Sequence, residues 1–492
     1  MSDNTHKRTS RPAGRQRPRS RPAPVVTVQP ARRVAYDVLA AVSRDDAYAN
    51  LLLPTAIKRA ALNTADAGLA TELCYGTLRL RGYYDRVIEL TAGRSIDDID
   101  LPVLDVLRLG SHQLLGMRVP SHAAVNESVS LAREVGSRSA SGFVNGVLRT
   151  LSRSEASEWK EKVLARAKNA DDRLAVEYAH PAWIIRAFRQ SLTAEGRVDE
   201  LEQLLAADND APRVNLIALP GLIDAPADAH PNAYSPVGFT LGHGDPDTTI
   251  GHAGGRLRVQ DEGSQLAALA LSRFELIRAG EQWLDLCAGP GGKTALLGAE
   301  AHTGHAHLDA NEITPARAEL VRRAIRPLAD VPEVSELDGR QIGEHRPNTY
   351  DRILVDAPCT GLGALRRRPE ARWRKTAKDV ADLTVLQASL LASAFDALKP
   401  GGTVAYVTCS PHIAETRGVV LAALGRWGAD AELLDTAAAL QRIAVHDLDL
   451  GDTTLGEHSG TVAQLWPHRH GTNAMFVALI RKTARPHDRE TP

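Results

Sequence analysis

The chain has 492 residues, 43% of them hydrophobic and 24% charged, which is the composition of a globular protein too long for a single hydrophobic core. Its formal net charge of −1 excludes a globally basic protein, so any nucleic acid must be bound by local patches. Four cysteines without a CxxC pair exclude a disulfide framework and indicate a reducing, cytoplasmic compartment, and the absence of an 18-residue apolar run argues against a membrane span.

The amino-terminal segment, residues 1–29, is strongly basic. It carries seven lysines and arginines against one acid, Asp3, with interspersed proline and serine. The segment has too few large apolar residues to offset the entropy lost when a chain becomes ordered, and we therefore expect it to be disordered. The segment is either an RNA-binding arm or a solubilising tail, and the sequence leaves both open. A second short tail is expected at residues 484–492.

Residues 30–165 are predicted to form an all-α domain. Apolar residues recur every three to four positions, as in VLDVLRLGSHQLL (103–115), and strand-like alternation is scarce. Residues 166–255 are instead crowded with Pro, Gly, Asp and His, which indicates a loop-rich connector subdomain with short strands.

Residues 256–483 alternate short apolar runs with helical segments, which predicts an α/β domain with a parallel sheet covered by helices on both faces. The runs are QWLDLC (282–287), HAHLDANE (305–312), YDRILVD (350–356) and TVAYVTC (403–409). In such sheets ligands bind beyond the carboxyl ends of the strands. The unusual residues of this half of the chain all lie at those ends.

A glycine-rich loop follows the first of these strands, in DLCAGPGGKT (285–294). A phosphate-binding P-loop is excluded because its spacing would require glycine at Cys287, and the absence of GxGxxG makes NAD a poor fit. Carboxylates end the next two strands: Glu312 is placed to bind a ribose diol and Asp338 to accept from an adenine amino group. A nucleoside cofactor is therefore expected at this loop, on residues Cys287, Ala288, Gly289, Pro290, Gly291, Gly292 and Lys293.

Two cysteines also end strands. Cys359 closes the run Asp356-Ala-Pro-Cys, and Cys409 follows TVAYVT. Free cysteine is common in protein cores, and a zinc site using both thiols with His412 or Cys287 is a further alternative. Only Cys409 and His412 have the close spacing usual for zinc ligands. Two thiols beside a nucleoside cofactor favour covalent chemistry on a pyrimidine.

These segments resemble the signature motifs of the RsmB/Sun-type RNA cytosine-C5 methyltransferases. The resemblance rests on DLCAGPGGKT, DAPCTGLGALRRRPEARW and YVTCSP, and extends upstream through VQDEGSQLAALAL to YGTLRLR, VNESVSLA and GFVNGVLRTLSR, which resemble the family's NusB-like helical domain. It covers nearly all of residues 30–482. The chain departs from the family pattern in TNAMFVAL (472–479), at Thr416 where many members have asparagine, and at Arg368 where many have histidine.

The resemblance implies a Rossmann-like methyltransferase domain that uses S-adenosylmethionine, without a metal, in a protein expected to be a monomer. It implies that Cys409 attacks cytosine C6, that Cys359 assists release, and that Asp356 is the acid near N3 and the cofactor. Its usual substrate is small-subunit ribosomal RNA. Transfer RNA, or a catalytically silent role as an RNA-binding assembly factor, are the alternatives.

The segment RRRPEARWRKTAK (366–378) is expected to bind RNA. It is dense in arginine and lysine against the single acid Glu370. Phosphates would dock on the cations and a base would stack on the tryptophan. The residues expected to do so are Arg366, Arg367, Arg368, Arg372 and Trp373, and the alternative is an ordinary solvated basic face.

Overall fold

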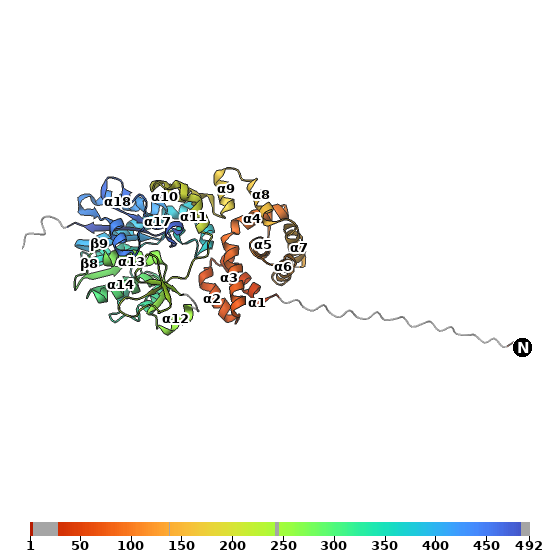
Figure 1. The fold of residues 1–492 in the computed structure, drawn as a ribbon, viewed down its shortest axis with the longest axis horizontal. Coiled ribbons are helices and arrows are strands. Elements are labelled where there is room, and N and C mark those ends of the chain that lie inside the picture. The colour runs from red at the N-terminus through yellow and green to blue at the C-terminus, as the bar shows by residue number, and fades with distance from the viewer. Residues whose placement is uncertain (3–27, 137, 242–245, 484–492) are drawn as a thin grey trace, which may run out of the picture.

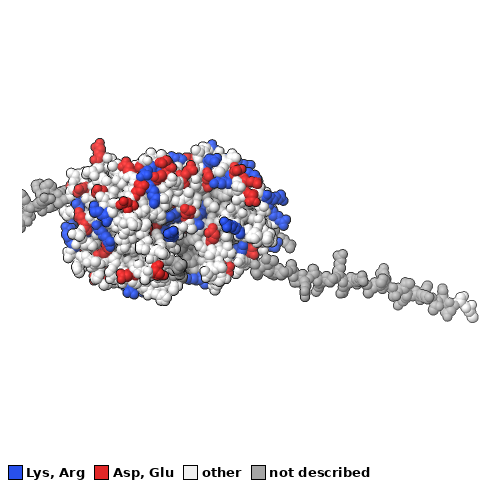
Figure 2. Space-filling model, in the orientation of Figure 1, with Lys and Arg blue, Asp and Glu red and all other residues white. Residues whose placement is uncertain are grey.

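The structure is a computed structural model that describes residues 1–2, 28–136, 138–241 and 246–483. The basic segment 1–29 lies almost entirely outside the described residues, and the carboxyl-terminal segment 484–492 lies entirely outside them. A helical part (red to yellow) lies beside an α/β part (green to blue), as Figure 1 shows. Acidic and basic side chains are mixed over the face shown in Figure 2, in keeping with the formal net charge of −1.

The amino-terminal part is helical, as predicted. Its helices are α1 (Pro30–Arg44), α2 (Ala49–Arg59), α3 (Thr64–Arg79), α4 (Arg81–Ala92), α5 (Leu101–Leu115), α6 (Ser121–Val135), α7 (Arg138–Leu151), α8 (Ala156–Leu164) and α9 (Ala170–Glu177). Helix α5 is apolar over most of its circumference and is buried among the others. Its Arg108 is buried too, and bonds Asp85 at 2.6 Å and Asp105 at 3.0 Å, so the buried charge is paired.

A connector joins the helical part to the α/β part. Helices α10 (Ala182–Ala194) and α11 (Leu201–Ala207) precede a small antiparallel sheet with the order β2-β3-β1-β4. The strands of this sheet are β1 (Leu216–Ala218), β2 (Ala229–Pro231), β3 (Gly238–Leu241) and β4 (Leu257–Val259), and helix α12 (Pro246–His252) lies between β3 and β4 in the sequence. Helices α10 and α11 share an apolar cluster with Leu362 and Trp466 of the α/β part. The connector is therefore packed against the α/β part.

The large sheet has the strand order β10-β14-β9-β8-β5-β6-β7, with β13 paired to β14. Its strands are β5 (Gln282–Asp285), β6 (His307–Asn311), β7 (Glu333–Ser335), β8 (Tyr350–Asp356), β9 (Leu398–Thr408), β10 (Ala431–Leu433), β13 (Ala463–Gln464) and β14 (Phe476–Lys482). Strands β5 to β9 are parallel, but β14 pairs with β9 antiparallel from Phe476↔Thr408 to Arg481↔Thr403. The four runs predicted to form a parallel sheet do so as β5, β6, β8 and β9. The whole sheet is mixed, because β14 was not among the predicted runs and an apolar run does not reveal the direction in which its strand joins a sheet.

Helices cover both faces of the sheet, as predicted. One core cluster joins the sheet to α13 (Glu262–Arg273), α14 (Gly292–Thr303), α15 (Pro315–Ile325) and α19 (Thr436–Ile443). The other joins it to α16 (Ile342–His345), α17 (Ala377–Ala397) and α18 (Arg417–Trp427). The remaining short elements are β11 (Thr454–Leu455), β12 (His458–Thr461) and α20 (Pro467–His470).

One helix corrects the expectation that the chain has no apolar run of membrane-spanning length. Helix α17, of 21 residues, is long and apolar enough to cross a membrane by length and composition. Its apolar side, with Leu391, Ala394 and Phe395, is buried in the core cluster against the sheet. A buried core helix meets the same criterion, and α17 occupies such a position.

Candidate active site

A cavity of about 650 Å³ lies at the carboxyl ends of β5, β6, β8 and β9, where the sheet topology places ligands. The glycine loop contributes Gly289 to its lining, and the two strand-end cysteines, Cys359 and Cys409, contribute their thiols. Its volume is that of a site for a cofactor-sized molecule. Both cysteines thus share this cavity with six of the sequence-predicted cofactor residues, whereas Ala288, Gly291, Gly292 and Lys293 do not line it; the six are Cys287, Gly289, Pro290, Glu312, Asp338 and Asp356.

The glycine loop and Glu312 form one hydrogen-bonded unit. The backbone N–H of Gly289 donates to Oε2 of Glu312 at 3.1 Å, and that of Thr314 donates to Oε1 at 3.0 Å. A Cβ atom at position 289 would lie 2.3 Å from Oε2, so a larger residue here would displace the Glu312 carboxylate from the loop. Glu312 is 3% exposed and lines the cavity. Its position suits a carboxylate that accepts from a ribose.

Asp338 also lines the cavity, but Arg340 already holds it. The Arg340 guanidinium bonds both carboxylate oxygens of Asp338, at 2.5–3.0 Å. These side-chain bonds lower the pKa of Asp338 below its ordinary value. An adenine amino group would have to share this carboxylate with Arg340.

Beneath the loop, Asp285 is wholly buried and accepts from Thr294 Oγ1 at 2.7 Å. Burial raises the pKa of Asp285 to about 7. This pair ties the end of β5 to the first turn of α14.

Lys293, predicted as part of the cofactor loop, points to the strand-end acid. Its Nζ lies 2.7 Å from Oδ2 of Asp356, which ends β8. Burial acts to lower the pKa of Lys293, but the Asp356 carboxylate outweighs it and the net direction is upward. The ammonium group stays charged beside Asp356 and near the thiol of Cys409.

The two cysteines face each other. Their Sγ atoms are 3.5 Å apart, and both residues are partly exposed. The hydrogen bond between them lowers the pKa of Cys409, assisted by the positive charges of Lys293 and Arg368, and raises the pKa of Cys359. Cys409 is therefore the more acidic thiol of the pair, and either sulfur atom can donate in the hydrogen bond between them.

Glu415 is a residue that the sequence analysis missed. It lies in a 3-10 turn after β9, is completely buried, and connects the two cysteine loops. On one loop it accepts from Thr360 N at 2.8 Å and from Thr360 Oγ1 at 2.5 Å; on the other it accepts from Ser410 Oγ at 2.6 Å. Gln387 of α17 donates to it at 3.2 Å. The only sequence signal was an acid six positions after Cys409.

The residues of the expected RNA-binding segment, 366–378, lie in different environments in the structure. Arg372 is fully buried and donates to the backbone oxygens of Arg79 and Asp208, so it joins the α/β part to the helical part and the connector. Arg366 is 7% exposed and donates to Gly471 O. The expectation that these two side chains contact phosphates is corrected, because both are buried and their terminal nitrogen atoms donate to acceptors within the protein.

Trp373 and Arg367 are also engaged. The indole lies against Gly82 of α4, where a Cβ atom would approach its ring to 2.5 Å, so it is not free to stack on a base. Arg367 pairs with Asp261 at 3.0 Å. Arg368, by contrast, is exposed and lines the cavity. Of the predicted RNA-binding residues, Arg368 is the one whose charge faces the site.

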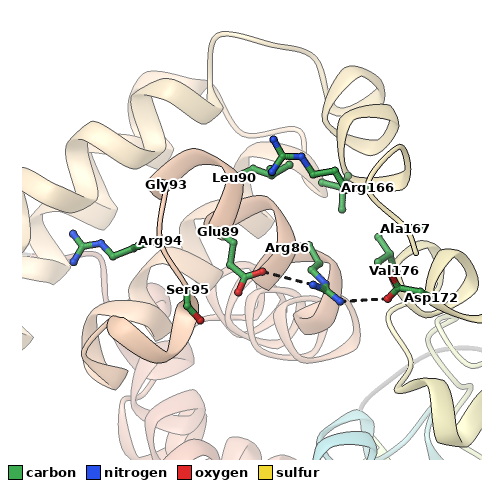
Figure 3. A pocket seen from close by; sticks show the side chains of 11 residues that line it. Arg86, Glu89, Leu90, Gly93, Arg94, Ser95, Arg166, Ala167, Asp172 and Val176 are labelled. Atoms are coloured by element: carbon green, nitrogen blue, oxygen red, sulfur yellow. Dashed lines mark hydrogen bonds and ion pairs between the residues drawn. The ribbon is translucent and has the colours of Figure 1, made fainter. Parts of the chain in front are cut away.

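A second cavity, of about 580 Å³, lies in the helical part between α4, α8 and α9 (Figure 3). Arg86 extends between Glu89 and Asp172, at 3.9 and 3.3 Å, so its charge is balanced within the cavity wall. None of its lining residues in the described part of the chain is a cysteine or histidine. Within the ranges that the structure describes, no three His, Cys, Asp or Glu side chains are grouped to hold a metal ion.

Comparisons with known proteins agree with this organisation. The family model of the 16S rRNA methyltransferases RsmB/F matches residues 276–481, and that of the NusB family matches residues 29–153. A methyltransferase of Mycobacterium tuberculosis is 46% identical over 475 residues, which cover 94% of this chain and 99% of that protein. The ribosomal RNA small subunit methyltransferase B of Serratia proteamaculans is 33% identical, over 76% of this chain and 85% of that one.

Among solved structures, the crystal structure of the protein PH0851 has a TM-score of 0.75 at 20% identity and covers 93% of this chain and 100% of its own. A methyltransferase homologue from Pyrococcus horikoshii has a TM-score of 0.50 at 23% identity and covers 63% of this chain and 97% of its own. These likenesses show the fold.

Proposed function

Because this chain belongs to the RsmB/F family of 16S rRNA methyltransferases, and is thus an S-adenosylmethionine-dependent RNA methyltransferase, we propose that it methylates C5 of a cytosine in small-subunit ribosomal RNA. The observation that carries the proposal is the pair of thiols, 3.5 Å apart, in one cavity with the Lys293–Asp356 ion pair. Such a site suits a pyrimidine as its reaction partner, because one thiol can add to the ring and the other can assist its release, roles that methyl transfer to oxygen or nitrogen does not call for.

The residues around the glycine loop fit S-adenosylmethionine. Glu312 would hold the ribose hydroxyls, Asp338 would face the adenine, and Gly289 and Pro290 of the loop line the same cavity. When bound, the cofactor supplies an electrophilic methyl group.

Cys409 is proposed as the nucleophile. Cytosine C5 is too weak a nucleophile to take a methyl group unaided, but thiolate addition at C6 turns the ring into an enamine whose C5 is reactive. The new S–C6 bond uses the thiolate electron pair, and the electrons of the C5–C6 double bond move toward N3 through the ring. Asp356, whose Oδ2 lies 2.7 Å from Lys293 Nζ, is placed to give a proton to N3 in its carboxylic acid form and to take that proton back when the ring is restored.

Cys359 is proposed to act in release. After C5 gains its methyl group, that carbon still carries a proton. A base must remove it so that its electron pair restores the C5–C6 double bond and the S–C6 bond breaks, which returns the Cys409 thiolate. Cys359 is 3.5 Å from the sulfur that leaves, and is the partner best placed to take part.

The target base must leave its stack to reach thiols that line a cavity. We therefore propose that the target lies in a single-stranded or easily opened segment of RNA. We also propose a cytoplasmic location, because both thiols must remain reduced to act. Transfer RNA remains the alternative substrate of the same chemistry. A silent assembly factor is disfavoured because it would need neither thiol in the cavity.

Bisulfite sequencing tests the proposal directly. Small-subunit ribosomal RNA from cells that lack the gene should lose protection at one or a few cytosines, and restoring the gene should return it. Purified enzyme with S-adenosylmethionine should methylate the unmodified transcript at the same position. If protection is unchanged in ribosomal RNA but lost in a transfer RNA, then the substrate is the transfer RNA. No change in either RNA would refute the reaction.

A further inference from the structure

One aromatic side chain of the helical part lies in the wall of the methyltransferase cavity. Tyr48 immediately precedes α2, in the loop that connects it to α1, and lines the same cavity as Cys359 and Cys409. It is 41% exposed, whereas most tyrosines and tryptophans of a folded protein bury their rings. The helical part therefore contributes a side chain to the proposed active site.

The loop that carries Tyr48 is fixed to the α/β part on both sides of the ring. Arg374 donates to the backbone oxygens of Val42 and Ala47, and the buried carboxylate of Glu370 accepts from the N–H of Ala49. These bonds connect residues more than 320 positions apart in sequence. Tyr48 thus has a set position at the cavity instead of belonging to a loose loop.

Two guanidinium groups lie against the Tyr48 ring. The Arg368 guanidinium is 5.4 Å from the ring centroid and that of Arg374 is 4.9 Å from it, both within the range of cation–π attraction. The backbone bonds described above occupy Arg374. Arg368 is exposed at the cavity, so it combines a contact with the ring and a positive charge that faces the site.

We propose that Tyr48 is a stacking platform for a nucleotide next to the target cytosine, with Arg368 contacting the adjoining phosphate. The inference rests on the proposed function. When the target base leaves its stack, its neighbours lose a stacking partner, and an exposed aromatic ring at the cavity restores that contact for any base. An arginine beside the ring supplies the charge that a phosphate requires. The helical part then positions the RNA at the reacting centre and does not merely add affinity at a distance.

The proposal is tested by one substitution that removes the aromatic ring of Tyr48 but keeps a large apolar side chain, and by another that keeps the ring. With an unmodified small-subunit ribosomal RNA transcript as probe, Tyr48→Leu should raise the Kd for RNA about 5- to 100-fold, the range for losing one base–aromatic stack. Tyr48→Phe keeps the ring and should stay within about threefold of the parent. Leu51→Ala is the matched control, since Leu51 lies in the first turn of α2, three residues after Tyr48, is 66% exposed, and does not line the cavity. The Kd for S-adenosylmethionine and the Tm should change little in all three.

A double-mutant cycle with the RNA identifies the stacked nucleotide. Once bisulfite sequencing has located the target, an abasic site is introduced at each neighbouring position of a short RNA fragment. At one of these positions, the abasic change should raise the Kd for the parent protein but should not raise the Kd for the Tyr48→Leu variant any further. Additive losses at both neighbours would overturn the inference while leaving the proposed function intact, and so would equal Kd values for the leucine and phenylalanine variants. A parent enzyme that does not methylate any cytosine would instead refute the proposed function itself.

Discussion

Replacing Glu415 by glutamine should slow the reaction as well as destabilise the fold. The carboxylate accepts two hydroxyl bonds on Oε2, from Thr360 and Ser410, and backbone and amide bonds on Oε1. Hydrogen bonds to a charged group contribute about 1.5–3 kcal/mol each. Glutamine keeps the volume and the acceptor at one oxygen, while the hydroxyls can turn to accept from its amide. We therefore expect a loss of about 1–3 kcal/mol in the free energy of unfolding.

The effect on rate follows from what Glu415 connects. Thr360 follows Cys359 and Ser410 follows Cys409, so a looser Glu415 lets the two sulfur atoms move from their separation of 3.5 Å. A misplacement of about 1 Å can cost on the order of 10²-fold in rate. The single-turnover rate of methyl transfer should fall by roughly 10- to 100-fold, while the Kd for S-adenosylmethionine is unchanged.

Glu300→Gln is the matched control. Glu300 is another buried carboxylate of the same domain, which accepts from Ser272 Oγ at 3.1 Å and from Arg273 at 2.7 and 2.8 Å and does not line the cavity. It should lose similar stability in urea unfolding but keep its rate. If both variants lose equal stability and both keep the parental rate, Glu415 does not position the cysteines.

The remaining predictions concern acidity, cofactor and RNA. Because the hydrogen bond with Cys359 lowers the pKa of Cys409, Cys359→Ala should move the rising limb of single-turnover methyl transfer to higher pH; an unshifted profile would contradict the thiolate assignment. Glu312→Ala should weaken S-adenosylmethionine binding by about 1–3 kcal/mol in calorimetry, with or without a chelator; unchanged binding would mean the ribose lies elsewhere. Arg368→Gln should reduce the salt dependence of RNA binding without changing the Tm. Arg372→Ala should instead lower the Tm, because it leaves buried backbone acceptors unpaired. The reverse pattern would refute both assignments.

The sequence predicted the strand ends well because each is a local pattern. The runs at 282–287, 305–312 and 350–356 all contain the observed strands β5, β6 and β8, and the glycine loop begins α14 within two residues of the expected position. Parallel topology then places these ends at one edge of the sheet without further information. The meeting of Cys359 and Cys409 follows from β8 and β9 being neighbours.

The errors concern contacts between distant segments. The residues Arg366, Arg372 and Trp373 have the composition of an RNA-binding surface, but the two arginines are buried against backbone acceptors elsewhere in the chain and the half-buried indole packs against Gly82. Likewise, Tyr48 gives no local sign that it reaches the cavity, since Arg374 and Glu370 hold it there from the far part of the sequence. Charge density along a sequence predicts a basic surface only when no such partner takes up the side chains.

Covalent trapping on RNA tests the central claim most directly. Each cysteine variant is incubated with S-adenosylmethionine and the unmodified ribosomal RNA transcript, then run on a denaturing gel. Cys359→Ala should transfer the methyl group and remain covalently joined to RNA, because addition at C6 needs only Cys409 and release needs Cys359. Cys409→Ala should give neither methylation nor a joined complex. A complex with Cys409→Ala would reverse the two roles, and full activity of both variants without any complex would contradict covalent catalysis.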